Sequence, residues 1–210
     1  MNPAFPLLFA ALAGFTHAFE TDHLLAVSSI VVRRNRLLLA VKDGIYWGLG
    51  HTSTILIIGL IVIAGKMAIS EGTFHYFEAA VGAMLVALGI VRIVKVLRRR
   101  PETAHPHLHD HEGKHHLAYG IGAVHGLAGS GALVVLVMSQ LSSVSGSIGY
   151  LLIFGLGSVV GMLLASGVFS LPFSQRHLSN AALQLALTLL SSGLCIWFGM
   201  QIVYENLTAA

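Results

Sequence analysis

Six long apolar segments constrain the fold of this 210-residue chain more than any other feature. They cover residues 5–32, 37–65, 74–97, 117–141, 147–173 and 178–204. Each is long enough to cross a bilayer core, which needs roughly 20 apolar residues of helix. Backbone groups in lipid bond within their own helix or within a closed barrel, and the alternating polar pattern of a barrel is absent from the sequence. The sequence therefore predicts an all-α polytopic membrane protein with six transmembrane helices.

The charged residues, only 10% of the chain, are distributed unevenly between the connections. Eleven of the 12 lysines and arginines flank or occupy the first, third and fifth connections, and only Lys66 belongs to an even-numbered one. By the positive-inside rule these odd connections face the cytoplasm, which places both termini outside a bacterial cytoplasmic (inner) membrane. Basic residues in this pattern are typical of membrane topology and give no support for a nucleic-acid partner. Membrane lipid is the expected partner, and the sequence leaves a homo-oligomer open.

Two sequence echoes suggest an internal repeat. Residues 154–157 (Phe-Gly-Leu-Gly) resemble residues 47–50 (Trp-Gly-Leu-Gly), and residues 124–127 (Val-His-Gly-Leu) resemble residues 16–19 (Thr-His-Ala-Phe) at nearly the same spacing. We therefore expect two three-helix repeats, over residues 1–97 and 117–210. Because each repeat has an odd number of spans, the two lie in inverted orientation, as in many secondary transporters.

Residues 98–116 form a histidine-rich cytoplasmic loop between the expected repeats. Histidine-rich tracts bind divalent metals through neutral imidazole. We expect this loop to be an auxiliary site that captures metal weakly, apart from the transport site; a solvated polar linker is the alternative. Its histidines are His105, His107, His109, His111, His115 and His116.

The first apolar run contains two imidazoles and two carboxylates, from His17, Glu20, Asp22 and His23. Ionisable groups at membrane depth cost several kcal/mol unless they are paired, hydrated or metal-bound, so each indicates a functional site. The second run is centred on His51, and the fourth has a histidine near its centre. A single buried histidine is more often a hydrogen-bonded structural residue, but three at one depth favour a shared metal site.

A regular helix cannot direct all of these side chains at one ion. At about 100° per residue, Asp22 lies about 140° and His23 about 240° around the helix from His17. The run is also about 42 Å long if it is helical throughout, which exceeds a core of about 30 Å. We therefore predict that the first helix is broken near residues 18–22, which membrane proteins tolerate where the chain lines a cavity.

The candidate metal ligands among these residues are His17, Glu20, Asp22, His23, His51 and His125. Imidazole and carboxylate without thiolate suit Ni²⁺, Co²⁺ or Zn²⁺ and not Cu⁺. Asp22 has the alternative role of accepting the other ring N–H of a ligating histidine. The single cysteine, Cys195, excludes a disulfide framework.

Three segments resemble motifs of the nickel/cobalt permease superfamily. Residues 17–23 match its His-x4-Asp-His signature, residues 49–54 resemble its Leu-Gly-His-Ser-type motif, and residues 125–130 are similar to the His-Gly-Leu-Ala-Gly-Ser segment of its short, urease-associated nickel transporter branch. The resemblance implies metal recognition by His17, Asp22, His23 and His51, and it leaves Glu20 and His125 as additional candidates. The chain differs from longer members in having Ser28 and Ser29 where they continue the signature with a second aspartate.

The expected function is a secondary transporter, not an enzyme, that moves Ni²⁺ inward through a site at the membrane midplane. Co²⁺ is the second candidate ion, and no resident cofactor is expected. Efflux is open because related exporters also carry a histidine-rich loop. A membrane protein that delivers metal without moving it is a further alternative. A rhomboid-like serine protease using Ser130 is the least favoured, because no histidine after His177 is available as its base.

Overall fold

The computed structural model describes residues 4–31, 37–65, 71–98, 115–140, 143–171 and 181–209. This part of the chain contains seven helices and no strand, which confirms the all-α class. The helices are α1 (Ala4–His17), α2 (Thr21–Val31), α3 (Leu37–Gly65), α4 (Glu71–Leu97), α5 (His115–Gln140), α6 (Val144–Ser170) and α7 (Ala181–Ala209).

The first apolar run forms two helices, so the predicted break is confirmed. The turn after α1 is closed by the Glu20 amide, which donates to the His17 carbonyl oxygen at 3.1 Å. The Glu20 carbonyl oxygen then accepts from the Leu24 amide at 2.9 Å and so begins the hydrogen bonding of α2. Asp22 lies in the first turn of α2, where the helix dipole favours a carboxylate. The break therefore falls at residues 18–20.

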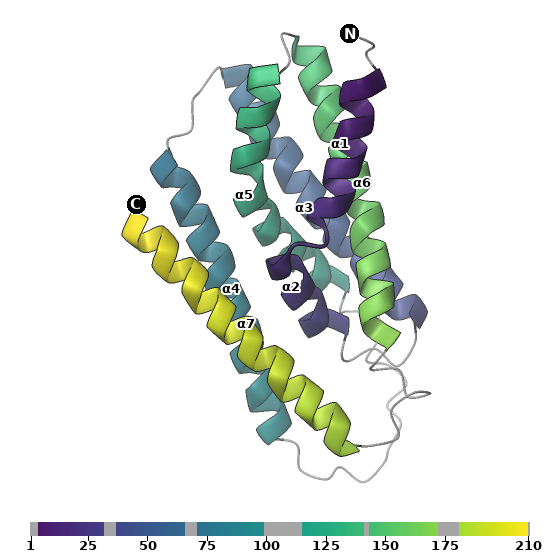
Figure 1. The fold of residues 1–210 in the computed structure, drawn as a ribbon, viewed down its shortest axis with the longest axis vertical. Helices are drawn as coiled ribbons and strands as arrows, with labels where there is room; N and C mark the ends of the chain where they lie inside the picture. Colours follow the sequence, from purple (N-terminus) through teal and green to yellow (C-terminus); the bar gives the residue numbers. More distant parts are fainter. Residues whose placement is uncertain are drawn as a thin grey trace.

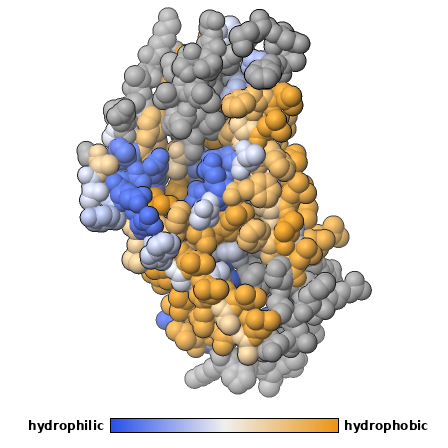
Figure 2. Space-filling model, in the orientation of Figure 1, coloured by the Kyte–Doolittle hydropathy of each residue, from blue (hydrophilic) through white to orange (hydrophobic). Residues whose placement is uncertain are grey.

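The outer surface of the molecule is apolar. Leu8 is 61% exposed and Leu38 is 80% exposed, and many other large apolar side chains are exposed too. Figure 2 shows hydrophobic residues over most of the described face. Soluble monomers rarely expose apolar surface of this extent. Among the described residues, four helices are long and apolar enough to cross a membrane, over residues 37–63, 72–97, 144–170 and 182–209. These features define a membrane protein, and the count of six spans stays a prediction.

The helices form a bundle with a tilted pair beside it (Figure 1). In the bundle α3 packs against α5 and α6, and α1 packs against α6. The pair consists of α4 and α7, which contact the bundle chiefly through α2 and α5. We call one end of the molecule the basic end. It contains the start of α3, with Lys42, and the end of α4, with Arg92, Lys95 and Arg98. Helices α1 and α7 have their chain termini toward the opposite end (Figure 1).

The first turn of α5 differs from the sequence expectation. His115 and His116 belong to this helix and not to the preceding loop. The His115 ring is buried, its Nδ1 lies 2.7 Å from Asp43 Oδ1, and it stacks on Tyr46 with ring centroids 5.2 Å apart. This contact ties α5 to α3 near the basic end. The other loop histidines, His105, His107, His109 and His111, lie outside the described residues.

Candidate metal centre

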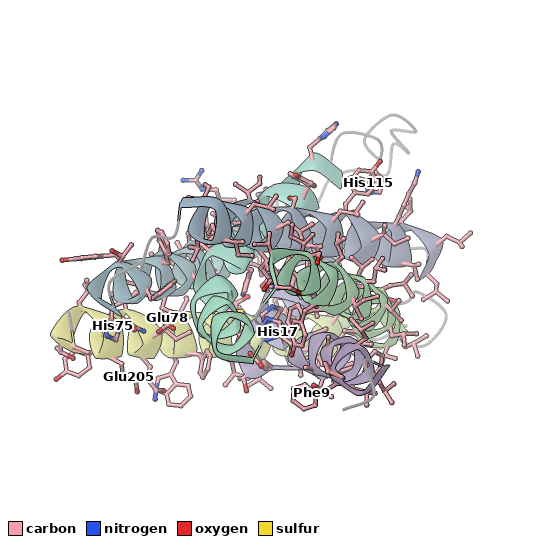
Figure 3. All side chains as sticks on the ribbon, turned by 90° about the horizontal axis from the view of Figure 1, so that it is seen from above. Phe9, His17, His75, Glu78, His115 and Glu205 are labelled. Carbon is pink, nitrogen blue, oxygen red and sulfur yellow. The ribbon has the colours of Figure 1, made fainter. Side chains whose placement is uncertain are left out.

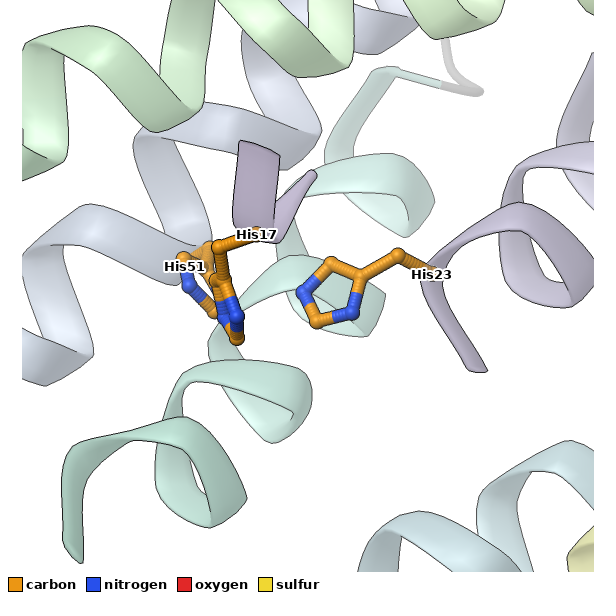
Figure 4. Close-up of side chains that lie close together, drawn as sticks. All are labelled: His17, His23 and His51. Atoms are coloured by element: carbon orange, nitrogen blue, oxygen red, sulfur yellow. The ribbon is translucent and has the colours of Figure 1, made fainter. Parts of the chain in front are cut away.

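Three histidines from three helices meet where α1 is interrupted. His17 ends α1, His23 lies in α2, and His51 comes from the middle of α3 (Figure 4). One ring nitrogen of each lies within 4.8 Å of one nitrogen of the other two. Ligands of a single ion at Zn–N distances of about 2.0–2.1 Å are about 3–4 Å apart. Side-chain movements of about 1 Å therefore bring these three nitrogens to coordinating positions.

Asp22 joins a second group that shares His23. One carboxylate oxygen of Asp22 lies 3.1 Å from His23 Nδ1, and the other lies 3.5 Å from His125 Nε2. The rings of His23 and His125 have centroids 4.7 Å apart. His23 is thus a member of both groups, and Asp22 either ligates an ion directly or holds the two imidazoles in position.

Glu20 orients His17 from the solvent side. Its Oε1 lies 2.9 Å from His17 Nδ1, and its side chain is 57% exposed. A carboxylate at this position accepts a hydrogen bond from the protonated Nδ1. This favours the tautomer in which the Nε2 lone pair is available to a metal. His17 Nε2 is buried and has no hydrogen-bond partner in the described part of the chain. Glu20 therefore supports a ligand, and its position does not require it to be one.

The deepest imidazoles are well suited to bind a cation. His23, His51 and His125 are at most 1% exposed. Apart from the Asp22 contacts to His23 Nδ1 and His125 Nε2, their ring nitrogens have no hydrogen-bond partner among the described groups. A buried polar group left unsatisfied costs about 1–3 kcal/mol. Several such groups at one point are stabilised together when a metal ion accepts their lone pairs. The donor set, imidazole with carboxylate, is the one that divalent nickel, cobalt and zinc prefer.

Two aromatic side chains, Trp47 and Phe154, pack against the histidines of the centre. The Trp47 ring lies 5.6 Å from the His23 ring and 6.0 Å from the His125 ring, and the Phe154 ring lies 5.6 Å from the His17 ring. Trp47 is not one of the site residues that the sequence motifs predict. Its position four residues before His51 puts both on one face of α3, and that spacing is the signal for its place beside the centre.

All six candidate ligands of the sequence analysis thus lie around one point, where α1, α2, α3 and α5 meet. Cys195 is not part of this centre. Its Sγ lies 3.4 Å from Ser29 Oγ, between α7 and the second half of α2. The Ser130 side chain, on which the protease alternative depends, lies outside the described residues.

Fold and site together define a helical membrane protein with a buried imidazole–carboxylate centre at a helix break. The chain is 36% identical over 192 residues to the urease accessory protein UreH of Bacillus sp. (strain TB-90), and the match covers 85% of this chain and 84% of that protein. This chain therefore belongs to the UreH family of urease accessory proteins. No protein-family model matches it. A search of solved structures also gave no match.

Proposed function

We propose that this protein is a secondary transporter that imports Ni²⁺, with Co²⁺ as the second candidate, across the bacterial cytoplasmic membrane. The observation that carries the proposal is the break at residues 18–20. It allows His17 and His23, which an intact helix directs apart, to face His51 at a centre between helices. Interrupted helices at the middle of the membrane are typical of the substrate sites of secondary transporters.

The choice of ion rests on two kinds of support. The name of the relative connects it with urease, and the motifs at residues 17–23, 49–54 and 125–130 resemble those of the urease-associated nickel transporter branch. The donor atoms of His17, Asp22, His23 and His51 are nitrogen and oxygen, which suits Ni²⁺ and Co²⁺. Neutral imidazole is needed for binding, so protons compete with the metal and transport falls as the solution becomes acidic.

Equivalent close contacts support the inverted repeat expected of such a transporter. A Cβ added at Gly14 of α1 would collide with the Phe154 carbonyl oxygen in α6, and a Cβ added at Gly122 of α5 would collide with the Trp47 carbonyl oxygen in α3. These are the positions that the sequence echoes align, since residue 122 follows residue 14 at the same spacing as His125 follows His17. The contact of α1 with α6 is thus matched by that of α5 with α3. Such equivalence is expected of two halves related by a pseudo-two-fold axis.

The proposed transport is tested with purified protein in liposomes. We expect radiolabelled Ni²⁺ to enter liposomes that contain the protein at a saturable rate, at least about tenfold above that of protein-free liposomes, with Co²⁺ competing. The accompanying whole-cell experiment records the sign of the change in cell nickel on expression. Metal binding without flux would identify a delivery protein, and a fall in cell nickel would identify an exporter.

The proposed orientation is tested by labelling from outside the cell. In a Cys195→Ser background, Thr208→Cys places a thiol near the end of α7, and Arg98→Cys places one at the basic end; both positions are exposed. We expect a membrane-impermeant maleimide to label Thr208→Cys in intact cells and Arg98→Cys only after permeabilisation. The reverse pattern would place the end of α7 in the cytoplasm and contradict the proposed orientation.

A further inference from the structure

A cavity of about 830 Å³ lies between the metal centre and the α4–α7 pair. One wall comes from the end of α1, the break and the start of α2, and it includes His17 and His23. The facing wall comes from the first half of α4 and the last turns of α7, and it includes Glu78 and Glu205. Figure 2 shows two hydrophilic areas on this face, separated by a hollow. Both walls are on the side of the centre away from the basic end.

The charges on this cavity are of one sign. Four carboxylates line it, those of Glu20, Asp22, Glu78 and Glu205, and no lysine or arginine is among its described lining residues. Figure 3 places Glu78 and Glu205 close to His75 on the α4–α7 pair, with His17 nearer the middle of the bundle. A cleft with charge of one sign and low-dielectric walls concentrates counter-ions and raises their association rate by about 10- to 1000-fold.

Glu78 is the most informative of these acids. It lies within an apolar helix, its side chain is partly buried, and it has no hydrogen-bond or ion-pair partner in the described part of the chain. An uncompensated carboxylate at such a place is costly and marks an ion pathway more often than a structural contact. Glu205, by comparison, is exposed and accepts a bond from Gln201 Nε2 at 2.9 Å.

A second observation independently indicates a cationic ligand in the same cavity. His23 lines it and is only 1% exposed, and its Nδ1 faces Asp22, yet its Nε2, like the buried Nε2 of His17, has no hydrogen-bond partner among the described groups. A nitrogen lone pair on a buried imidazole beside acidic walls favours a positively charged occupant. A divalent ion with six waters takes about 200 Å³, at about 30 Å³ per water, so the cavity has room for a hydrated ion.

We propose that Glu78 and Glu205 form a receiving site for a hydrated divalent cation, from which the ion passes to His17 and His23. The two carboxylates attract the ion through its water shell, since neither lies in a group close enough to chelate it. The ion loses its waters on reaching the imidazoles. This inference rests on the proposed function, because it assigns the path by which the transported metal reaches the centre.

The test compares Glu78→Gln, Glu205→Gln and their combination with wild type, using NiCl₂ as the only metal. The combined variant is expected to raise the half-saturating Ni²⁺ concentration for liposome uptake about tenfold, while maximal flux changes less than twofold. Added salt screens the acidic walls, so wild-type uptake at low Ni²⁺ is expected to fall as ionic strength rises, and uptake by the combined variant is expected to depend much less on salt. Glu78→Asp keeps the charge, so its half-saturating Ni²⁺ concentration is expected to lie closer to that of wild type than the value for Glu78→Gln.

Calorimetric titration of the detergent-solubilised protein with NiCl₂ separates this inference from the transport function. If wild type binds Ni²⁺ without moving it, weaker and less salt-sensitive binding in the combined variant still supports the receiving site. Unchanged half-saturation and unchanged salt dependence in the combined variant would overturn the receiving site and leave transport intact. Equal losses in Glu78→Asp and Glu78→Gln would also overturn it, because they would show that side-chain length and not charge matters.

Discussion

Replacing His23 with alanine is expected to reduce Ni²⁺ flux by more than about 100-fold, to the level of protein-free liposomes. His23 belongs to both ligand groups, so its removal takes a donor from each. Substituting a residue that only orients a metal ligand lowers affinity or activity 10- to 100-fold, and removing a direct ligand is expected to lower it further. Radiolabelled uptake and calorimetric binding, measured on the same preparations, check this result.

The matched control for His23→Ala is His75→Ala. His75 is a half-buried histidine in α4, but its Nδ1 lies 2.8 Å from Asn206 Oδ1 and it belongs to neither ligand group. We expect flux within about twofold of wild type for His75→Ala. If His23→Ala has wild-type flux, the metal centre is not part of the transport path, whatever the result for the control.

Replacing Gly122 with alanine is expected to lower the free energy of unfolding by about 1–3 kcal/mol, the usual cost of overpacking a well-packed contact. A Cβ there would collide with the Trp47 carbonyl oxygen, so α5 and α3 have to separate. Small residues allow helix backbones to approach in membranes, and the loss of one weakens the contact. The midpoint of thermal unfolding in detergent is the measurement.

Gly120 provides a control within two residues of Gly122. A Cβ added there meets nothing within 4 Å, so Gly120→Ala keeps the contact and gains up to about 1 kcal/mol of helix propensity. Gly14→Ala is expected to behave like Gly122→Ala, because the proposed repeat makes the two contacts equivalent. Equal stability of Gly120→Ala and Gly122→Ala would show that α5 and α3 do not depend on close backbone contact at Gly122.

The position of the break and the meeting of the histidines follow from the sequence for identifiable reasons. Helix geometry alone shows that His17 and His23 diverge on an intact helix, and the cost of ionisable groups in lipid supplies the reason to bring them together. The long apolar runs likewise correspond to helices whose ends lie within a few residues of the expected ones. Helix α3, over Leu37–Gly65, matches the expected segment at both ends.

Contacts made by single residues far apart in the chain do not follow from periodicity. His115 is one of six histidines in a polar tract, and nothing in that tract distinguishes it, yet it stacks on Tyr46 and pairs with Asp43. Glu78, near one end of its apolar run, has the sequence pattern of an interfacial residue. Only the tilt of α4 and α7 places it on a cavity wall opposite His23.

The sequence by itself determined the helical membrane class, the interruption of the first span and the set of imidazoles and carboxylates at its centre. These depend on local rules, namely apolar length, helix geometry and the cost of burying charge. The tertiary structure decided which nitrogen each carboxylate holds, that Trp47 and Phe154 close the centre, and that an acidic cavity leads to it. These depend on how the helices pack, and packing is set by contacts such as those of Gly14 and Gly122, which no single segment contains.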